Sequence, residues 1–68
     1  VEIDPHDTGI LYNVACTYSL AGRIEEAIDY LEKAVAEGFA QKEWIVNDGD
    51  LAPLREHSRY LTLINSMN

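Results

Sequence analysis

Cysteine, basic residues and long apolar runs are all scarce in this sequence. Cys16 is the only cysteine among 68 residues, so no disulfide can form within the chain. A single thiol fits the reducing compartments of the cell, and we expect the protein to be cytoplasmic. No apolar run approaches the roughly 20 residues that a membrane-spanning helix needs, so no membrane association is expected.

Lysine and arginine are also few, with 5 basic residues against 12 acidic ones and a net charge of −7. Proteins that bind phosphate backbones or anionic lipids use clustered Lys and Arg side chains. Nucleic acid and membrane surfaces are therefore not expected as partners. The hydrophobic content of 47% is ordinary for a globular protein, and the length predicts one small domain of marginal stability.

Apolar residues at helical spacing predict a first helix over about residues 8–21. Asp7 precedes it as a suitable N-cap, because its carboxylate can accept from backbone N–H groups one turn further on. Gly22 is expected to end the helix, since glycine reaches the left-handed conformation of a tight turn. The helix contains no charged residue, so most of its circumference should face protein rather than water.

A second helix is predicted over about residues 24–37, closed by Gly38. Glu25 and Glu26 lie in its first turn, where the helix dipole favours negative charge. Its apolar stripe consists of Ile24, Ala27, Ile28, Leu31, Ala34 and Val35. The two helices should form an antiparallel pair joined by the glycine turn.

The spacing of these residues resembles the tetratricopeptide repeat. The matching positions are Leu11, Val14, Ala15 and Tyr18, followed by Gly22, Ile24, Ala27, Leu31 and Ala34. Pro5 lies one period of about 34 residues before Phe39, at the family's proline position, so residues 1–7 are interpreted as the tail of a preceding unit. The resemblance implies an all-α fold, in which residues 8–39 form a helix hairpin and small residues such as Ala15 and Ala27 permit a close approach.

After Phe39 the repeat pattern fails, and shorter elements are predicted near residues 41–47 and 58–66, with a turn over residues 48–50. The order of residues in this part resembles the end-of-group domain that closes many bacterial tetratricopeptide proteins. The residues that carry this resemblance are Gly38-Phe39, Trp44-Ile45, Asp48-Gly49-Asp50-Leu51, Pro53-Leu54-Arg55 and Arg59-Tyr60. Residues 40–68 are accordingly interpreted as a degenerate capping segment of short helices at the end of an α-solenoid fragment. Tyr18, Trp44 and Tyr60 are expected in the core.

Two segments suggest a metal at first glance. His6 lies between Asp4 and Asp7, but a single histidine among carboxylates near a helix start indicates capping and solvation. The turn over residues 47–50 resembles a calcium loop, yet the twelfth position counted from its first aspartate is Arg59 instead of the required glutamate. We therefore expect no metal and no cofactor.

Cys16 and His57 would be the candidates for a nucleophile and a base. No third orienting group is indicated, and an apolar environment raises the pKa of a thiol. We expect no catalytic residues and no enzyme activity.

The resemblance implies that the first helix lines a groove for a protein or peptide. The candidate groove residues are Gly9, Tyr12, Asn13, Cys16 and Ser19. Asn13 matches a recurrent asparagine of the family that hydrogen-bonds the extended backbone of a ligand, and bonding to the adjacent helix pair is an equally good interpretation. The lysines of repeats that hold acidic chaperone tails are missing, so that ligand is not expected.

The leading hypothesis is a noncatalytic protein–protein interaction module, the terminal part of a tetratricopeptide array. One alternative is a segment that regulates a cyclase or kinase on the same parent chain, since similar terminal segments follow such domains in bacterial signalling proteins. A third is self-association as a homodimer through the first helix. There Ile10, Val14 and Thr17 cannot all be covered by one partner helix and a short cap.

Overall fold

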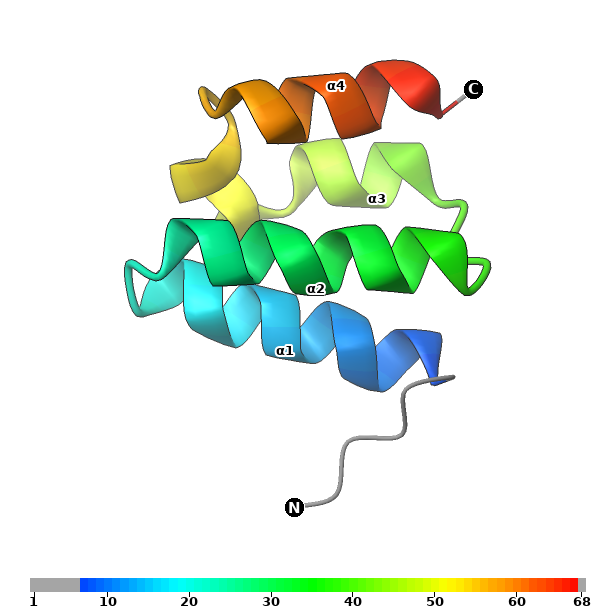
Figure 1. Cartoon of the computed structure of the whole chain (residues 1–68), viewed down its shortest axis with the longest axis horizontal. Coiled ribbons are helices and arrows are strands. Elements are labelled where there is room, and N and C mark those ends of the chain that lie inside the picture. The colour runs from blue at the N-terminus through cyan, green and yellow to red at the C-terminus, as the bar shows by residue number, and fades with distance from the viewer. Residues whose placement is uncertain (1–6, 68) are drawn as a thin grey trace.

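The computed structural model of the chain describes residues 7–67 and consists of helices only within that range (Figure 1). The elements are the α-helices α1 (Thr8–Leu20), α2 (Ile24–Ala36), α3 (Lys42–Asn47) and α4 (Ser58–Ser66), with the 3₁₀ helix η1 (Gly49–Leu54) between α3 and α4. The predicted all-α fold is confirmed for this part of the chain. The interpretation of residues 1–6, with Pro5 and His6, lies outside the described residues.

The ends of α1 and α2 form where the sequence places a cap or a glycine. The Asp7 side chain accepts a hydrogen bond from the backbone N–H of Ile10 at 3.1 Å, as expected of an N-cap. Gly22 and Gly38 have φ angles of 81° and 116°, a region that side-chain-bearing residues rarely adopt. Both predicted helix ends are therefore confirmed.

The hairpin of α1 and α2 packs through small residues. Ala15 on α1 and Ala27 on α2 are both completely buried, so the core has methyl groups at these two positions. The rest of the shared core is supplied by Leu11, Tyr12, Cys16, Ile28, Leu31, Ala34, Ile45, Leu51, Leu54, Tyr60 and Met67. Because this list draws on every helix, the hairpin and the shorter helices form one hydrophobic core.

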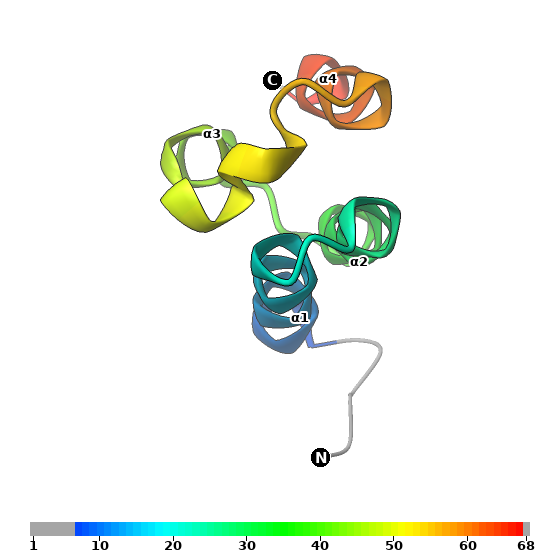
Figure 2. The same cartoon turned by 90° about the vertical axis from the view of Figure 1, so that its left-hand side faces the viewer.

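The C-terminal elements pack on one side of the hairpin, as the view along the helices shows (Figure 2). The 3₁₀ helix η1 contacts both α1 and α2, whereas α4 contacts α2. Arg59 joins α4 to α2 through charged contacts, with Nη2 at 2.7 Å from Asp29 Oδ1 and 2.8 Å from Glu32 Oε1. Its Nη1 lies 3.6 Å from Glu25 Oε1. A single guanidinium thus neutralises an acidic stretch of α2 where α4 crosses it.

The expected burial of aromatic residues is confirmed for Tyr60 and wrong for Trp44. Tyr60 is 3% exposed, and Tyr18 is half-buried with its ring stacked on Tyr30. Trp44 is 61% exposed. The physical reason is the shortness of α3, whose six residues bury Ile45 alone, so the indole on another side of that helix faces solvent. None of the helices described here is long and apolar enough to cross a membrane.

Candidate functional site

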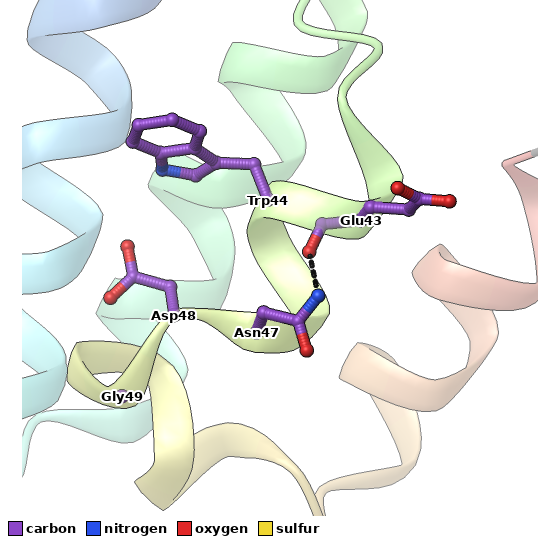
Figure 3. Close-up of a pocket in the computed structure, with 5 residues that line it drawn as sticks. All are labelled: Glu43, Trp44, Asn47, Asp48 and Gly49. Atoms are coloured by element: carbon purple, nitrogen blue, oxygen red, sulfur yellow. Dashed lines mark hydrogen bonds between the residues drawn. The ribbon is translucent and has the colours of Figure 1, made fainter.

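The exposed tryptophan borders an open hollow on the surface of α3 (Figure 3). The hollow has a volume of about 490 Å³ and is lined by Glu43, Trp44, Asn47, Asp48 and Gly49. We call it the Trp44 hollow. The indole of Trp44 and the carboxylate of Asp48 extend to the same side, while the carboxylate of Glu43 points away from them (Figure 3).

Local hydrogen bonds hold the walls of the Trp44 hollow. The Asn47 side-chain amide donates to the backbone carbonyl of Glu43 at 2.9 Å. Asp48 caps η1, because its Oδ1 accepts from the backbone N–H of Asp50 at 2.9 Å. Arg55 donates to the carbonyl of Val46 at 3.1 Å and to that of Asp48 at 3.5 Å. The link between α3 and η1 is therefore fixed by side chains from both sides.

Asp48 also connects this link to α1. The Tyr12 hydroxyl donates to Asp48 Oδ2 at 2.5 Å, and the Cys16 thiol donates to the same oxygen at 3.9 Å. One turn further along α1, the Ser19 hydroxyl donates to the backbone carbonyl of Asp50 at 2.7 Å. These contacts fasten the start of η1 along one side of α1.

The environment of Tyr12 and Cys16 keeps both groups protonated near neutral pH. Burial is the largest cause that raises the pKa of Tyr12, and its hydrogen bond to Asp48 adds to the effect. Burial, followed by the charges of Asp48 and Asp50, raises the pKa of Cys16 to about 11. A neutral thiol is a poor nucleophile. His57 is engaged elsewhere, since its Nδ1 accepts from the backbone N–H of Arg59 as the N-cap of α4.

Among the described residues, Cys16, Asp48 and Asp50 form a group that could hold a metal ion, with one ligand atom of each lying within 4.8 Å of the others. The two aspartates are neighbours in the sequence, whereas Cys16 is 32 positions from Asp48 and joins them only in the folded chain. A metal would need the thiolate form, which the raised pKa of Cys16 disfavours. It would also compete with the donors that already bind Asp48.

The five candidate groove residues fall into two groups. Tyr12, Cys16 and Ser19 are 6%, 8% and 1% exposed and lie together beneath the start of η1. In this conformation their contacts are made within the chain itself. Gly9 and Asn13 are exposed on α1, and the Asn13 carbonyl accepts from the Thr17 hydroxyl at 3.0 Å. The part that all five play in binding a partner stays a prediction.

Trp44 is the feature of this surface that the sequence argument missed. It lies directly after the charged pair Lys42 and Glu43 and directly before Ile45. In α3 only Ile45 is buried, and the side chain of Trp44 points about 100° away from it around the helix. The sequence gives no signal that tells which of these two side chains enters the core.

No protein-family model, curated protein or solved structure matches this chain. The resemblance to the tetratricopeptide repeat stays a prediction from the residues.

Proposed function

We propose that the chain is a noncatalytic protein–protein interaction module that holds a protein or peptide at the Trp44 hollow. The observation that carries this proposal is the 61% exposure of Trp44 beside an open hollow. Tryptophan is among the residues most enriched at the energetic centres of protein interfaces, because it combines large apolar area with an N–H donor. An exposed indole framed by polar groups suits the anchor point of such an interface.

We further propose that residues 8–39 are a tetratricopeptide-type repeat and that residues 40–68 are its cap, the terminal part of an array. The complete burial of Ala15 and Ala27 and the left-handed turn at Gly22 support this assignment. Terminal units of helical arrays cover an apolar face that a further repeat would otherwise cover. The buried Leu51 and Leu54 of η1 are suited to that role, since η1 packs against both helices of the hairpin.

The α1 surface beside the hollow can extend the contact. Gly9 and Asn13 are exposed and lie one helical turn apart. Gly9 is three positions before Tyr12 and Asn13 three before Cys16, so both border the side of α1 that contacts Asp48. A peptide anchored on Trp44 could therefore reach the side-chain amide of Asn13.

Selection of peptides from a random library, followed by nuclear magnetic resonance mapping, tests the proposal. Trp44 is the only tryptophan, so its indole N–H gives a single signal in the spectrum of the ¹⁵N-labelled chain. Selected peptides should shift that signal together with the amides of Asp48 and Gly49. Failure to select any peptide, or shifts confined to α4, would contradict the proposal.

Self-association through α1 is a second candidate that one observation favours. Leu20, the last residue of α1, is 65% exposed, and Thr17 one turn before it is exposed as well. Ile10 and Val14 are half-buried. An exposed leucine on a helix without charged residues is an apolar surface that a second copy of the chain could cover.

A further inference from the structure

The charged residues that line the Trp44 hollow are all acidic. Glu43 and Asp48 belong to its wall, and a carboxylate oxygen of Asp50 lies within 4.8 Å of one from Asp48. Within residues 7–67, neither Asp48 nor Asp50 forms an ion pair with a basic side chain. These two carboxylates thus have no ion-pair partner in this part of the chain, and the Arg55 guanidinium contacts Asp48 only at its backbone carbonyl.

The hydrogen bonds to Asp48 do not remove its charge. Its carboxylate accepts from the Tyr12 hydroxyl, the Cys16 thiol and the Asp50 N–H, which are all neutral donors. The negative charge is felt locally, because Asp48 and Asp50 contribute after burial to the raised pKa of Cys16. These bonds hold the carboxylate in place at the edge of the hollow.

The chain has no lysine or arginine side chain left to pair with these carboxylates. All five of its Lys and Arg residues lie within the described part, and each already contacts a group other than the carboxylates of Asp48 and Asp50. Arg23 pairs with Glu26, Lys33 lies over the Tyr30 ring, Lys42 donates to the Met67 carbonyl, Arg55 donates to the Val46 and Asp48 carbonyls, and Arg59 pairs with α2. A basic side chain that pairs with these carboxylates would therefore come from a partner.

The indole of Trp44 is a second group, beside the two carboxylates, that can attract a cation. Arg23 lies 5.3 Å from the centre of the Tyr18 ring, and Lys33 lies 4.6 Å from that of Tyr30. No cation of the described residues lies over Trp44, although tryptophan offers the strongest cation–π attraction of the aromatic side chains. The same contact that the chain makes twice with its tyrosines is open at its tryptophan.

We propose that the Trp44 hollow takes a basic segment of a partner protein, with an Arg or Lys side chain placed between the indole of Trp44 and the carboxylates of Asp48 and Asp50. This inference rests on the proposed function and names the chemistry of the partner. Arginine fits best, because its planar guanidinium stacks on aromatic rings and also binds carboxylates. An acidic segment would be repelled by the net charge of −7.

Two peptides of equal length, with neutral blocked ends, test the inference. One has two arginines in a Gly/Ser sequence, and the other has citrulline, a neutral analogue of arginine, at the same two positions. They are titrated into the ¹⁵N-labelled chain in buffer that contains EDTA, which removes metal ions from the carboxylates. The arginine peptide should shift the Trp44 indole signal and the Asp48 and Asp50 amides, with a Kd at least about fivefold lower than that of the citrulline peptide. The preference should shrink between about 0.05 M and about 0.5 M NaCl, because salt screens exposed charges. Equal Kd values for the two peptides would overturn the inference.

Three variants locate the effect. Asp50→Asn removes one charge whose carboxylate accepts no hydrogen bond among the described residues, and Trp44→Leu keeps an apolar side chain but removes the indole. Each should weaken the arginine peptide about threefold or more. Glu56→Gln is the matched control, since it makes the same change in net charge at an exposed residue outside the hollow and should alter the Kd by less than about twofold. An equal loss in Asp50→Asn and Glu56→Gln would contradict a local site.

The outcomes separate this inference from the proposed function. If library-selected neutral peptides shift the Trp44 indole signal while arginine gives no preference over citrulline, the inference is wrong and the interaction module stands. If no peptide of any charge shifts that signal, both are wrong.

Discussion

Replacing Tyr12 with Phe removes the hydroxyl group that forms the hydrogen bond between α1 and the Asp48 side chain. The Tyr12 hydroxyl donates to Asp48 Oδ2 at 2.5 Å, and the two residues are 36 positions apart along the chain. The ring itself stacks on Phe39 with centroids 4.6 Å apart, a contact that phenylalanine at position 12 would keep. The substitution therefore isolates the hydrogen bond from the packing.

We expect this substitution to lower the free energy of unfolding by about 1–2 kcal/mol. A hydrogen bond to a charged group contributes about 1.5–3 kcal/mol. We expect a value at or just below the lower end of that range, because the contact is only partly buried and Asp48 still accepts from Cys16 and from Asp50. The variant should keep its helical content, since the hairpin core does not involve the hydroxyl group.

Urea unfolding followed by far-UV circular dichroism measures the effect. For a chain of this size, a urea dependence of about 1 kcal/mol per molar is expected, so the midpoint should fall by about 1–2 M. Tyr30→Phe is the matched control, because the Tyr30 ring is stacked on Tyr18 and its hydroxyl forms no hydrogen bond among the described residues. Equal midpoints for Tyr12→Phe and Tyr30→Phe would refute the role given to the Tyr12 hydroxyl.

Four further predictions follow from the packing, the charges and the exposed surfaces. Ala27→Leu should lower the free energy of unfolding by about 1–3 kcal/mol, because Ala27 is completely buried. Ala36→Leu, at the exposed end of α2, should lower it much less, and equal urea midpoints for the two variants would contradict close packing at Ala27. The pKa of Cys16 is raised from its ordinary value of about 9 to about 11, so the folded chain holds this proton more tightly than the unfolded chain does. The stability that comes from this difference is complete below about pH 9 and is lost as the pH rises through 11. Cys16→Ala should lack that part of the alkaline loss, and a stability difference from the unmodified chain that is the same at every pH would be evidence against it. Arg59→Gln should lower Tm by leaving the carboxylates of α2 without the cation that binds α4, and an unchanged Tm in calorimetry would contradict this. Ile10→Lys should dissociate a homodimer formed through α1; sedimentation that shows a monomer at high concentration, or a dimer unaffected by the substitution, would exclude that interface.

The parts of the fold that depend on neighbouring residues are predictable from the sequence. The helix ends at Gly22 and Gly38 and the N-cap at Asp7 each follow from the conformational or hydrogen-bonding property of one residue. The observed bounds of α1 and α2 accordingly differ from the expected ones by one residue at their C-terminal ends. Fraying of the last turn accounts for differences of that size.

The parts that depend on distant residues are not predictable in the same way. Spacing along α1 indicates that Tyr12, Cys16 and Ser19 share one side of the helix, but not which segment covers that side. The cover is Asp48 and Asp50, more than 30 positions away along the chain. The exposure of Trp44 has the same origin, because it depends on how a six-residue helix is turned when Ile45 enters the core.

The central claim is that Trp44 anchors a protein or peptide partner. Isothermal titration calorimetry with a library-selected peptide tests it most directly, by comparing the unmodified chain with Trp44→Ala and Leu61→Ala. Leu61, on α4, is 48% exposed and serves as the matched apolar residue outside the Trp44 hollow. If Trp44 anchors a partner, Trp44→Ala should weaken binding by about 2 kcal/mol, roughly thirtyfold in Kd, while Leu61→Ala leaves it unchanged. Equal affinities for all three proteins would contradict the assignment of this surface as the binding site.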